Sequence, residues 1–354
     1  MRRLARYLLG LALAALLAAA ALLGGRLWLL ERMHRPHGFP APRTVTIAKG
    51  ESARSILSRL ESAGVVASAR WTRLYLVREL GDPPLLAGEY RFEPPLSADQ
   101  VLEKLRRGEV VTYPVTVVEG LTFAETAEAL AAAGLGSRER FLAEFADPRR
   151  VRDLDREAAN LEGYLFPDTY RFRRGTSEAE VTDALVAEFR RHWERDVRPR
   201  IASGDATTPR ALLILASLVE KEARLDAERP LVAAVYANRL RRGMGLYADP
   251  TIIYGLKLAG RWDGNLRRRD LEQDSPWNTY RILGLPPGPI CSPGLASLAA
   301  AARPAAVDYL YFVSRNDGTH VFSASLAEHN RNVDIWQRQY FRRRRARGRA
   351  GLRD

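Results

Sequence analysis

The sequence has little cysteine, histidine and lysine. Its one cysteine, Cys291, excludes a disulfide within the chain and any zinc site built on cysteines. The five histidines show no metal-ligand spacing such as His-x-x-x-His, and neither standard Gly-rich phosphate loop occurs. These absences argue against redox, metal and nucleotide chemistry. We therefore predict no cofactor and no metal.

The positive charge is concentrated at the two ends of the chain. The net charge is +13 over 354 residues, but residues 1–40 carry +5 and residues 341–354 carry +6, which leaves +2 for the rest. A nearly neutral body lacks the excess of basic residues that nucleic-acid binding needs, and we predict no nucleic-acid partner. Residues 342–354 form a basic tail that either meets anionic lipid or wall polymers or is disordered.

The N-terminus has the pattern of a membrane anchor. Arg2, Arg3 and Arg6 precede nineteen uncharged residues, Tyr7 to Gly25. At about 1.5 Å per residue this run matches a hydrocarbon core of roughly 30 Å. The positive-inside rule places the arginines in the cytoplasm and the body outside it. A cleaved signal peptide is the alternative, but the run is longer than a typical signal-peptide core. We predict a single-pass protein of the inner membrane with an extracytoplasmic body.

A short pattern occurs twice after a Pro-containing linker predicted over residues 31–43. Residues 45–64 and 115–134 each contain a β-branched strand, a Gly turn, a Ser or Thr that begins a helix, and a Gly that ends it. Gly50 aligns with Gly120 and Ser52 with Thr122 without gaps. The pattern resembles the LysM-type glycan-binding module, although a packed βα unit without a ligand has the same spacing.

The helix predicted over residues 210–226 carries the first candidate for chemistry. Leu212, Leu215 and Val219 belong to an apolar stripe, and Glu220 falls on the flank of that stripe. A carboxyl group at such a rim can be partly desolvated, which favours its protonated form. A Glu-Lys-Glu cluster at a helix end is more often simply solvated, so the helix alone does not decide between the two.

A Pro/Gly-rich stretch, residues 249–294, follows the helix predicted over residues 228–241, and another helix is predicted earlier, over residues 141–157. Residues 284–294 contain four prolines and three glycines, which stiffen the backbone and keep side-chain bulk low. Asn278, Thr279 and Tyr280 lie nearby and supply neutral polar groups. Such a loop suits the wall of a cleft for an uncharged sugar chain, and it is also compatible with a buried structural loop.

Five segments in one order resemble a known family. They are residues 161–170 (LEGYLFPDTY), 216–222 (ASLVEKE), 249–255 (DPTIIYG), 278–280 (NTY) and 284–288 (GLPPG). Together they resemble the endolytic murein transglycosylase family (MltG, YceG-like), from about Val45 to Trp336. The sequence departs from the family wording at residues 246–248 and 275–277, near the cleft, and in the Arg-rich tail.

The resemblance implies cleavage of the MurNAc-β-1,4-GlcNAc bond of nascent peptidoglycan without water, leaving 1,6-anhydro-MurNAc ends and terminating strand elongation. Glu220 occupies the position taken as the family's catalytic glutamate, and would protonate the glycosidic oxygen and then accept the proton of the C6 hydroxyl. No second carboxylate is required, although Asp249, Glu162 and Glu222 are candidates. The implied substrate-binding residues are Glu162, Tyr164, Asp249, Thr251, Tyr254, Asn278, Thr279, Tyr280 and Pro287. Implied partners are peptidoglycan glycan strands, the inner membrane and cell-wall synthases (penicillin-binding proteins).

The predicted fold is α+β, with an N-terminal transmembrane helix, a LysM-like βα subdomain and a mixed α/β catalytic domain. The predicted boundaries are residues 1–30 for the cytoplasmic N-terminus and anchor, 31–43 for the linker, 44–112 for the LysM-like subdomain, 113–341 for the catalytic domain and 342–354 for the tail. The alternative function is a non-catalytic, membrane-anchored peptidoglycan-binding scaffold. A carboxyl group placed for acid catalysis distinguishes the enzyme from the scaffold.

Overall fold

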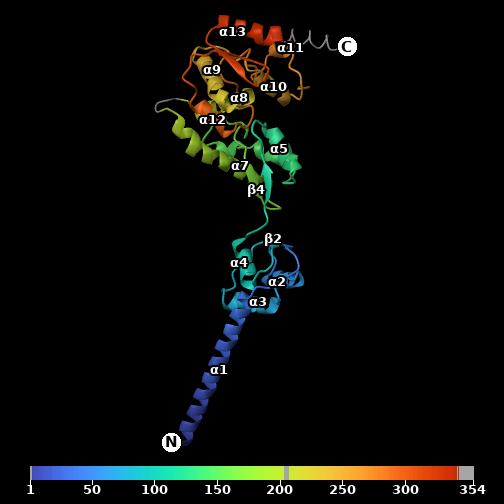
Figure 1. The fold of residues 1–354 in the computed structure, drawn as a ribbon, viewed down its shortest axis with the longest axis vertical. Coiled ribbons are helices and arrows are strands. Elements are labelled where there is room, and N and C mark those ends of the chain that lie inside the picture. Colours follow the sequence, from blue (N-terminus) through green and yellow to red (C-terminus); the bar gives the residue numbers. More distant parts are fainter. Residues whose placement is uncertain (1, 203–206, 341, 343–354) are drawn as a thin grey trace. The chain divides into compact units, whose positions relative to one another are not determined.

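The computed structural model describes residues 2–202, 207–340 and 342. The described chain mixes helices with three two-stranded sheets and divides into two compact units (Figure 1). The first unit is the chain up to Tyr113 together with Arg171–Gly175, and the second is the remainder. All but one residue of the predicted basic tail, residues 343–354, lies outside the described residues.

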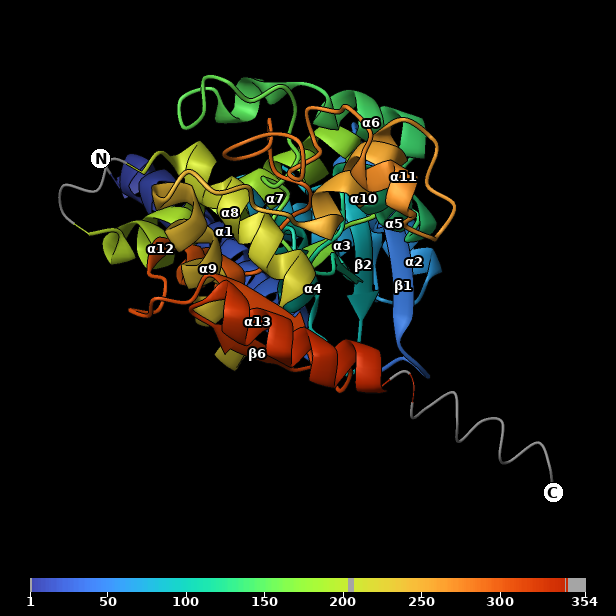
Figure 2. The same cartoon turned by 90° about the horizontal axis from the view of Figure 1, so that it is seen from above.

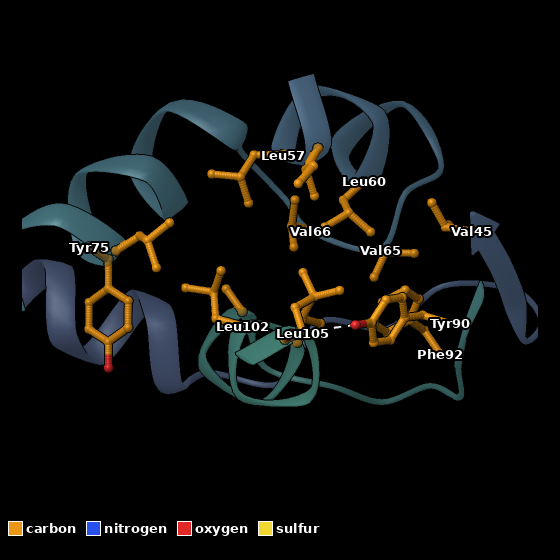
Figure 3. Close-up of a cluster of buried hydrophobic side chains, with 14 of the residues drawn as sticks. Val45, Leu57, Leu60, Val65, Val66, Tyr75, Tyr90, Phe92, Leu102 and Leu105 are labelled. Atoms are coloured by element: carbon orange, nitrogen blue, oxygen red, sulfur yellow. Dashed lines mark hydrogen bonds between the residues drawn. The ribbon is translucent and has the colours of Figure 1, made fainter. Parts of the chain in front are cut away.

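The first unit begins with α1 (Arg2–His34), which is long and apolar enough to cross a membrane. It continues with β1 (Arg43–Ile47), α2 (Ala53–Ser62), α3 (Ala69–Arg78), β2 (Gly88–Phe92) and α4 (Ala98–Arg107). The strands β1 and β2 pair antiparallel, with Val45 opposite Tyr90 (Figure 2). Their inner side chains and the apolar faces of the helices form one buried cluster, in which the Tyr90 hydroxyl donates to the carbonyl of Leu105 (Figure 3).

The segment predicted as a linker is partly built into this unit. The helix α1 runs on to His34, and Met33 and Phe39 are buried in the cluster. His37 forms a β-bridge with Leu96. The prolines therefore stop the helix only after its last turn has packed, and the apolar Met33 and Phe39 tie the following segment down.

The second unit contains a bundle of helices with two small sheets. Its elements are β3 (Tyr113–Thr116, which starts at the boundary), α5 (Phe123–Ala132), α6 (Arg138–Phe145), β4 (Thr169–Phe172, whose last two residues belong to the first unit), α7 (Glu178–His192), α8 (Pro209–Glu222), α9 (Arg229–Arg241), α10 (Asp249–Leu258), α11 (Arg268–Leu271), α12 (Leu295–Ala302), β5 (Tyr311–Ser314), β6 (His320–Ser323) and α13 (Leu326–Val333). Short 3-10 or π segments cover Pro148–Val151, Trp193–Val197, Arg198–Arg200, Asp226–Glu228 and Asp334–Gln339.

The two copies of the sequence repeat have the same local structure. Ser52 and Thr122 each begin a helix by accepting a hydrogen bond from the backbone N–H three residues later. Gly50 and Gly120 both have φ near +80°, the left-handed conformation that the turn before the helix needs. Each copy continues as strand, two helices and a strand that pairs with the first. The copies differ mainly in the segment before the last strand, which is longer in the second copy.

Two predicted elements differ from the structure. The helix predicted over residues 141–157 is wrong, because α6 ends at Phe145 and Pro148 starts a 3-10 turn. The Pro/Gly-rich stretch contains α10, which accommodates Pro250 because a proline in the first turn of a helix lacks only an N–H that would have no partner there.

The helix α8 lies at the centre of the second unit. Every residue from Leu212 to Val219 is buried, so the helix has no solvent-facing side along this stretch. It packs on α9, α10 and α12. The surroundings of the two glutamates at its C-terminal end are therefore set by these neighbouring helices.

Candidate active site

Glu220 is held by the start of α12. Its Oε2 atom accepts hydrogen bonds from the backbone N–H of Gly294 at 3.0 Å and the hydroxyl of Ser297 at 2.8 Å. The same oxygen lies 3.1 Å from the guanidinium of Arg229, and both side chains are at least nine-tenths buried. Arg229 also bonds to Ser297 and Asp226. Within the described structure, Glu220 thus acts as the anionic cap of α12 and the partner of a buried arginine.

Glu222, two residues further on, faces a different environment. It lines a cavity of about 560 Å³ whose wall also includes Asp249 and Tyr280. The Tyr236 hydroxyl donates to Glu222 Oε1 at 3.0 Å. Burial raises the pKa of Glu222 to about 7; the hydrogen bond from Tyr236 lowers it, and the nearby charge of Asp249 raises it further. Glu220 is not among the described residues that line this cavity.

Asp249 stands at the first position of α10, on the wall of the same cavity. Its Oδ1 atom accepts a hydrogen bond from the Tyr280 hydroxyl at 2.7 Å. Burial and the adjacent Asp249 raise the pKa of Tyr280, so this tyrosine remains a hydrogen-bond donor at neutral pH. The cavity therefore contains two carboxyl groups in unequal surroundings, with Asp249 neutralised by no described ion pair.

The other side chains predicted to bind substrate are mostly buried in the scaffold. Glu162 accepts hydrogen bonds from the Phe123 N–H at 2.9 Å and the Tyr254 hydroxyl at 3.0 Å. Burial raises the pKa of Glu162 to about 8. Tyr164 is buried and donates to Asp155 at 2.7 Å. Glu162 thus contacts α10 through Tyr254, and Asp155 links Tyr164 to Arg210 of α8. Neither Glu162 nor Tyr164 lines the cavity.

The predicted polar residues in and next to α10 form hydrogen bonds within the protein. Thr251 and Thr279 are fully buried and lie 3.0 Å apart through their hydroxyls, beside Ala248. Asn278 is buried and donates to two backbone carbonyls. The exposed Pro287 offers its carbonyl to Arg210. Of the predicted binding residues, the structure brings only Asp249 and Tyr280 to the cavity.

Sequence reasoning missed much of the cavity wall. Arg239 comes from α9, Tyr247 from the loop before α10, Tyr311 from β5 and His329 from α13. Tyr247 lies in residues 246–248, which depart from the family's sequence motifs, and this departure is the one sequence feature that could have drawn attention to it. Tyr311 and His329 carry no motif that could have indicated them.

Comparison with known proteins identifies the family. The model of the YceG-like family matches residues 45–335. The chain belongs to the YceG-like family. A Bacillus subtilis (strain 168) relative named "Endolytic murein transglycosylase" is 33% identical over 303 residues, covering 81% of this chain and 82% of the relative. A Streptococcus pneumoniae (strain D39) relative of the same name is 29% identical and covers 82% of this chain but 57% of its own.

A solved structure supports the same family. The crystal structure of a YceG-like protein from Listeria monocytogenes is 32% identical to this chain, with a TM-score of 0.55. The match covers 82% of this chain and 98% of the Listeria chain. Family membership thus rests on sequence and on structure.

Proposed function

We propose that this YceG-like protein is an endolytic peptidoglycan lytic transglycosylase that cleaves the MurNAc-β-1,4-GlcNAc bond and leaves 1,6-anhydro-MurNAc ends. The carrying observation is the carboxyl group of Glu222, which opens onto the cavity and has a pKa of about 7. A general acid works best with a pKa near the working pH. The names of the relatives support the substrate class.

We propose Glu222, in place of the Glu220 indicated by the family motif, as the acid and then the base. The Tyr236 hydroxyl engages Oε1, which leaves Oε2 to carry the transferable proton. Glu222 gives this proton to the departing O4 of GlcNAc as the bond to C1 of MurNAc breaks. Its carboxylate then takes the proton of the MurNAc C6 hydroxyl as O6 bonds to C1. Water does not take part, and Glu222 ends the cycle protonated.

Asp249 has a separate role in this mechanism. Positive charge develops at C1 and the ring oxygen in the transition state of glycosidic bond cleavage. A carboxylate on the cavity wall stabilises that charge, and the Tyr280 hydroxyl holds it in place. The same negative charge favours the protonated form of Glu222 before the reaction begins. Two carboxyl groups with different surroundings can thus serve as acid and as electrostatic stabiliser.

We also propose roles for the helix α1 and the first unit, and a class of partner. The helix α1 would anchor the protein in the inner membrane with its N-terminus in the cytoplasm and both units outside. The first unit would act as the LysM-like glycan-binding subdomain. Cell-wall synthases of the penicillin-binding class would supply the nascent strand that the enzyme cuts.

The decisive experiment compares Glu222→Gln with Glu220→Gln on purified glycan strands, with products identified by mass spectrometry. Glu222→Gln removes the transferable proton and should lower the rate of anhydro-end formation by about 10²–10⁴-fold without unfolding the protein. Glu220→Gln is the matched control on the same helix. It should lower the free energy of unfolding by about 1–3 kcal/mol, because it weakens the buried bonds to Arg229, and leave the rate per folded molecule close to wild type.

Two results would contradict the proposal. Reducing sugar ends in place of anhydro ends would mean that water attacks C1. A folded Glu220→Gln protein without activity, together with an active Glu222→Gln protein, would return the catalytic role to Glu220.

A further inference from the structure

One wall of the cavity is a row of flat side chains around a buried arginine. The guanidinium carbon of Arg239 lies 5.4 Å from the ring centroid of Tyr247 and 5.2 Å from that of Tyr311. The Tyr280 ring packs on Tyr247, with centroids 5.1 Å apart. On the other side, His329 stacks on Tyr311 at 5.1 Å. Arg239 is fixed by three backbone carbonyls, so the wall has a rigid centre.

Tyr247 is the exposed member of this row. Its accessible fraction is 51%, whereas tyrosine rings elsewhere in the second unit, such as those of Tyr164 and Tyr236, are buried. Exposure of a large aromatic ring on a cavity wall leaves apolar surface in water, which is unfavourable unless a ligand covers it.

The backbone at Tyr247 is in an unfavourable conformation. Its φ is +53°, in the left-handed region that a bulky residue rarely adopts. The loop holds it there: the Tyr247 N–H donates to the Thr279 carbonyl at 3.3 Å, and the Ala248 N–H donates to the Thr279 hydroxyl at 2.9 Å. Asparagine or glycine would adopt this conformation more easily. A tyrosine at this position thus adopts an unfavourable backbone conformation, and its ring is held at a defined position.

Gly245 makes room for that ring. A Cβ atom at Gly245 would lie 2.9 Å from Cε1 of Tyr247 and 3.2 Å from its Cζ. The ring therefore lies against the bare backbone two residues earlier, with Arg239 as a second support. The ring is held in place before any ligand arrives.

We propose that Tyr247 is a stacking platform for one pyranose ring of the glycan, a subsite beside Glu222. The C–H groups on one face of an uncharged β-linked sugar form an apolar surface, which packs on an aromatic face, and its hydroxyls remain hydrogen-bonded to water or to the polar wall. This inference rests on the proposed function for the choice of sugar chain. Tyr247 positions substrate and takes no part in proton transfer.

The test measures binding separately from cleavage. Full-length protein carrying Glu222→Gln is titrated calorimetrically with peptide-free GlcNAc–MurNAc oligosaccharides. Adding Tyr247→Asn removes the ring but suits the left-handed backbone, and should weaken binding about fivefold to tenfold. Adding Tyr247→Phe keeps the ring and should change binding by less than about twofold. Leu258→Asn removes an exposed apolar side chain that does not line the cavity and serves as the control.

Kinetics on the otherwise wild-type enzyme give the second readout. Tyr247→Asn should raise KM by a similar factor with kcat nearly unchanged, because a platform contributes to binding in the ground state and the transition state alike. Gly245→Ala, which displaces the ring without removing it, should also raise KM.

The stacking role would be overturned if adding Tyr247→Asn left the oligosaccharide affinity of the Glu222→Gln protein unchanged. It would also be overturned if Tyr247→Phe weakened the affinity as much as Tyr247→Asn. Absence of anhydro ends with wild-type enzyme would overturn the proposed chemistry instead, and the binding comparison would still decide the platform.

Discussion

Glu220 and Glu222 are separated by a single lysine, yet their surroundings suit opposite tasks. Glu220 meets three donors on one oxygen, including a buried guanidinium, which hold its side chain in place. Glu222 has one tyrosine donor, a neighbouring carboxylate and an opening to the cavity. The first arrangement ties the Glu220 carboxyl group to its neighbours, and the second makes the Glu222 carboxyl group able to give and take a proton near neutral pH.

The pH dependence of the rate follows from the raised pKa of Glu222. The first step needs the protonated acid, whose population falls as the pH rises through about 7. We expect kcat/KM for anhydro-end formation to be high at pH 6 and to decline about tenfold per pH unit well above pH 7. Initial rates on glycan strands in buffers from pH 5.5 to 9 would measure this. A rate that rises up to pH 9 would exclude Glu222 as the acid.

Loss of folded protein at high pH would also lower the rate, so the stability of the protein is measured at each pH as a control. Glu162 is also more easily protonated in the folded state than in the unfolded chain, because burial raises its pKa to about 8. The folded state therefore binds more protons, and the contribution of Glu162 to stability is lost as the pH rises from about 4.5 through about 8. Thermal melts at each pH, on wild type and on Glu162→Gln, separate this effect from catalysis. The decline in rate should persist in Glu162→Gln.

The sequence allowed the family and an N-terminal helix long and apolar enough to cross a membrane to be predicted, but not which glutamate faces the cavity. Glu220 would lie on the flank of α8 only if the helix had one buried apolar stripe with a rim. In the structure the helix is buried on all sides, so a wheel cannot tell its faces apart. Tyr311 and His329 reach the cavity from elements far along the chain, and no local pattern reports such contacts.

At the level of elements, two of the predicted site residues, Glu162 and Tyr164, lie in an insertion of the repeat. Both copies form a strand, two helices and a closing strand. The second copy carries a longer segment between α6 and β4, which contains Glu162, Gly163 and Tyr164. Within this insertion Gly163 lies against Leu213 of α8, so the second copy contacts the helix that carries Glu220 and Glu222. The gap-free pairing of Gly50 with Gly120 predicted the common part but could not indicate what the insertion touches.

A substitution at Gly163 tests how closely that insertion approaches α8. Its φ is +84°, and a Cβ there would lie 2.7 Å from Cβ of Pro289 and 3.1 Å from Cδ2 of Leu213. Gly163→Ala therefore combines backbone strain with a clash against a rigid ring. We expect it to lower the free energy of unfolding by about 3–5 kcal/mol, as measured by denaturant titration.

Gly134→Ala is the matched control for this substitution. Gly134 has a similar φ of +78°, but a Cβ added there would meet no atom within 4 Å. Only the backbone cost applies, so the loss should be about 1–2 kcal/mol. Equal losses for the two variants would show that the close approach at Gly163 relaxes without cost.

On the scale of the whole molecule, the apolar helix α1 is structurally continuous with the rest of the first unit. The apolar part of α1 is exposed, whereas Leu29 and Met33 near its end belong to the buried cluster of the first unit. Arg26 forms a two-pronged ion pair with Glu79, and Trp28 packs edge-to-face on Trp71. The folded unit therefore begins within a few residues of the end of the apolar run.

This continuity favours an uncleaved anchor over a signal peptide. Removal of the chain up to about residue 25 would separate the apolar run from a helix that continues without a break into the first unit. We expect the mature protein, extracted from membranes with detergent, to keep residues 1–30 in its intact mass. A reporter that is active only outside the cytoplasm, fused after residue 354, should be active, because Arg2, Arg3 and Arg6 retain the N-terminus inside. A mature N-terminus near residue 25 would show that the protein is secreted. An inactive extracytoplasmic reporter would show the opposite orientation, with the proposed site on the side away from peptidoglycan.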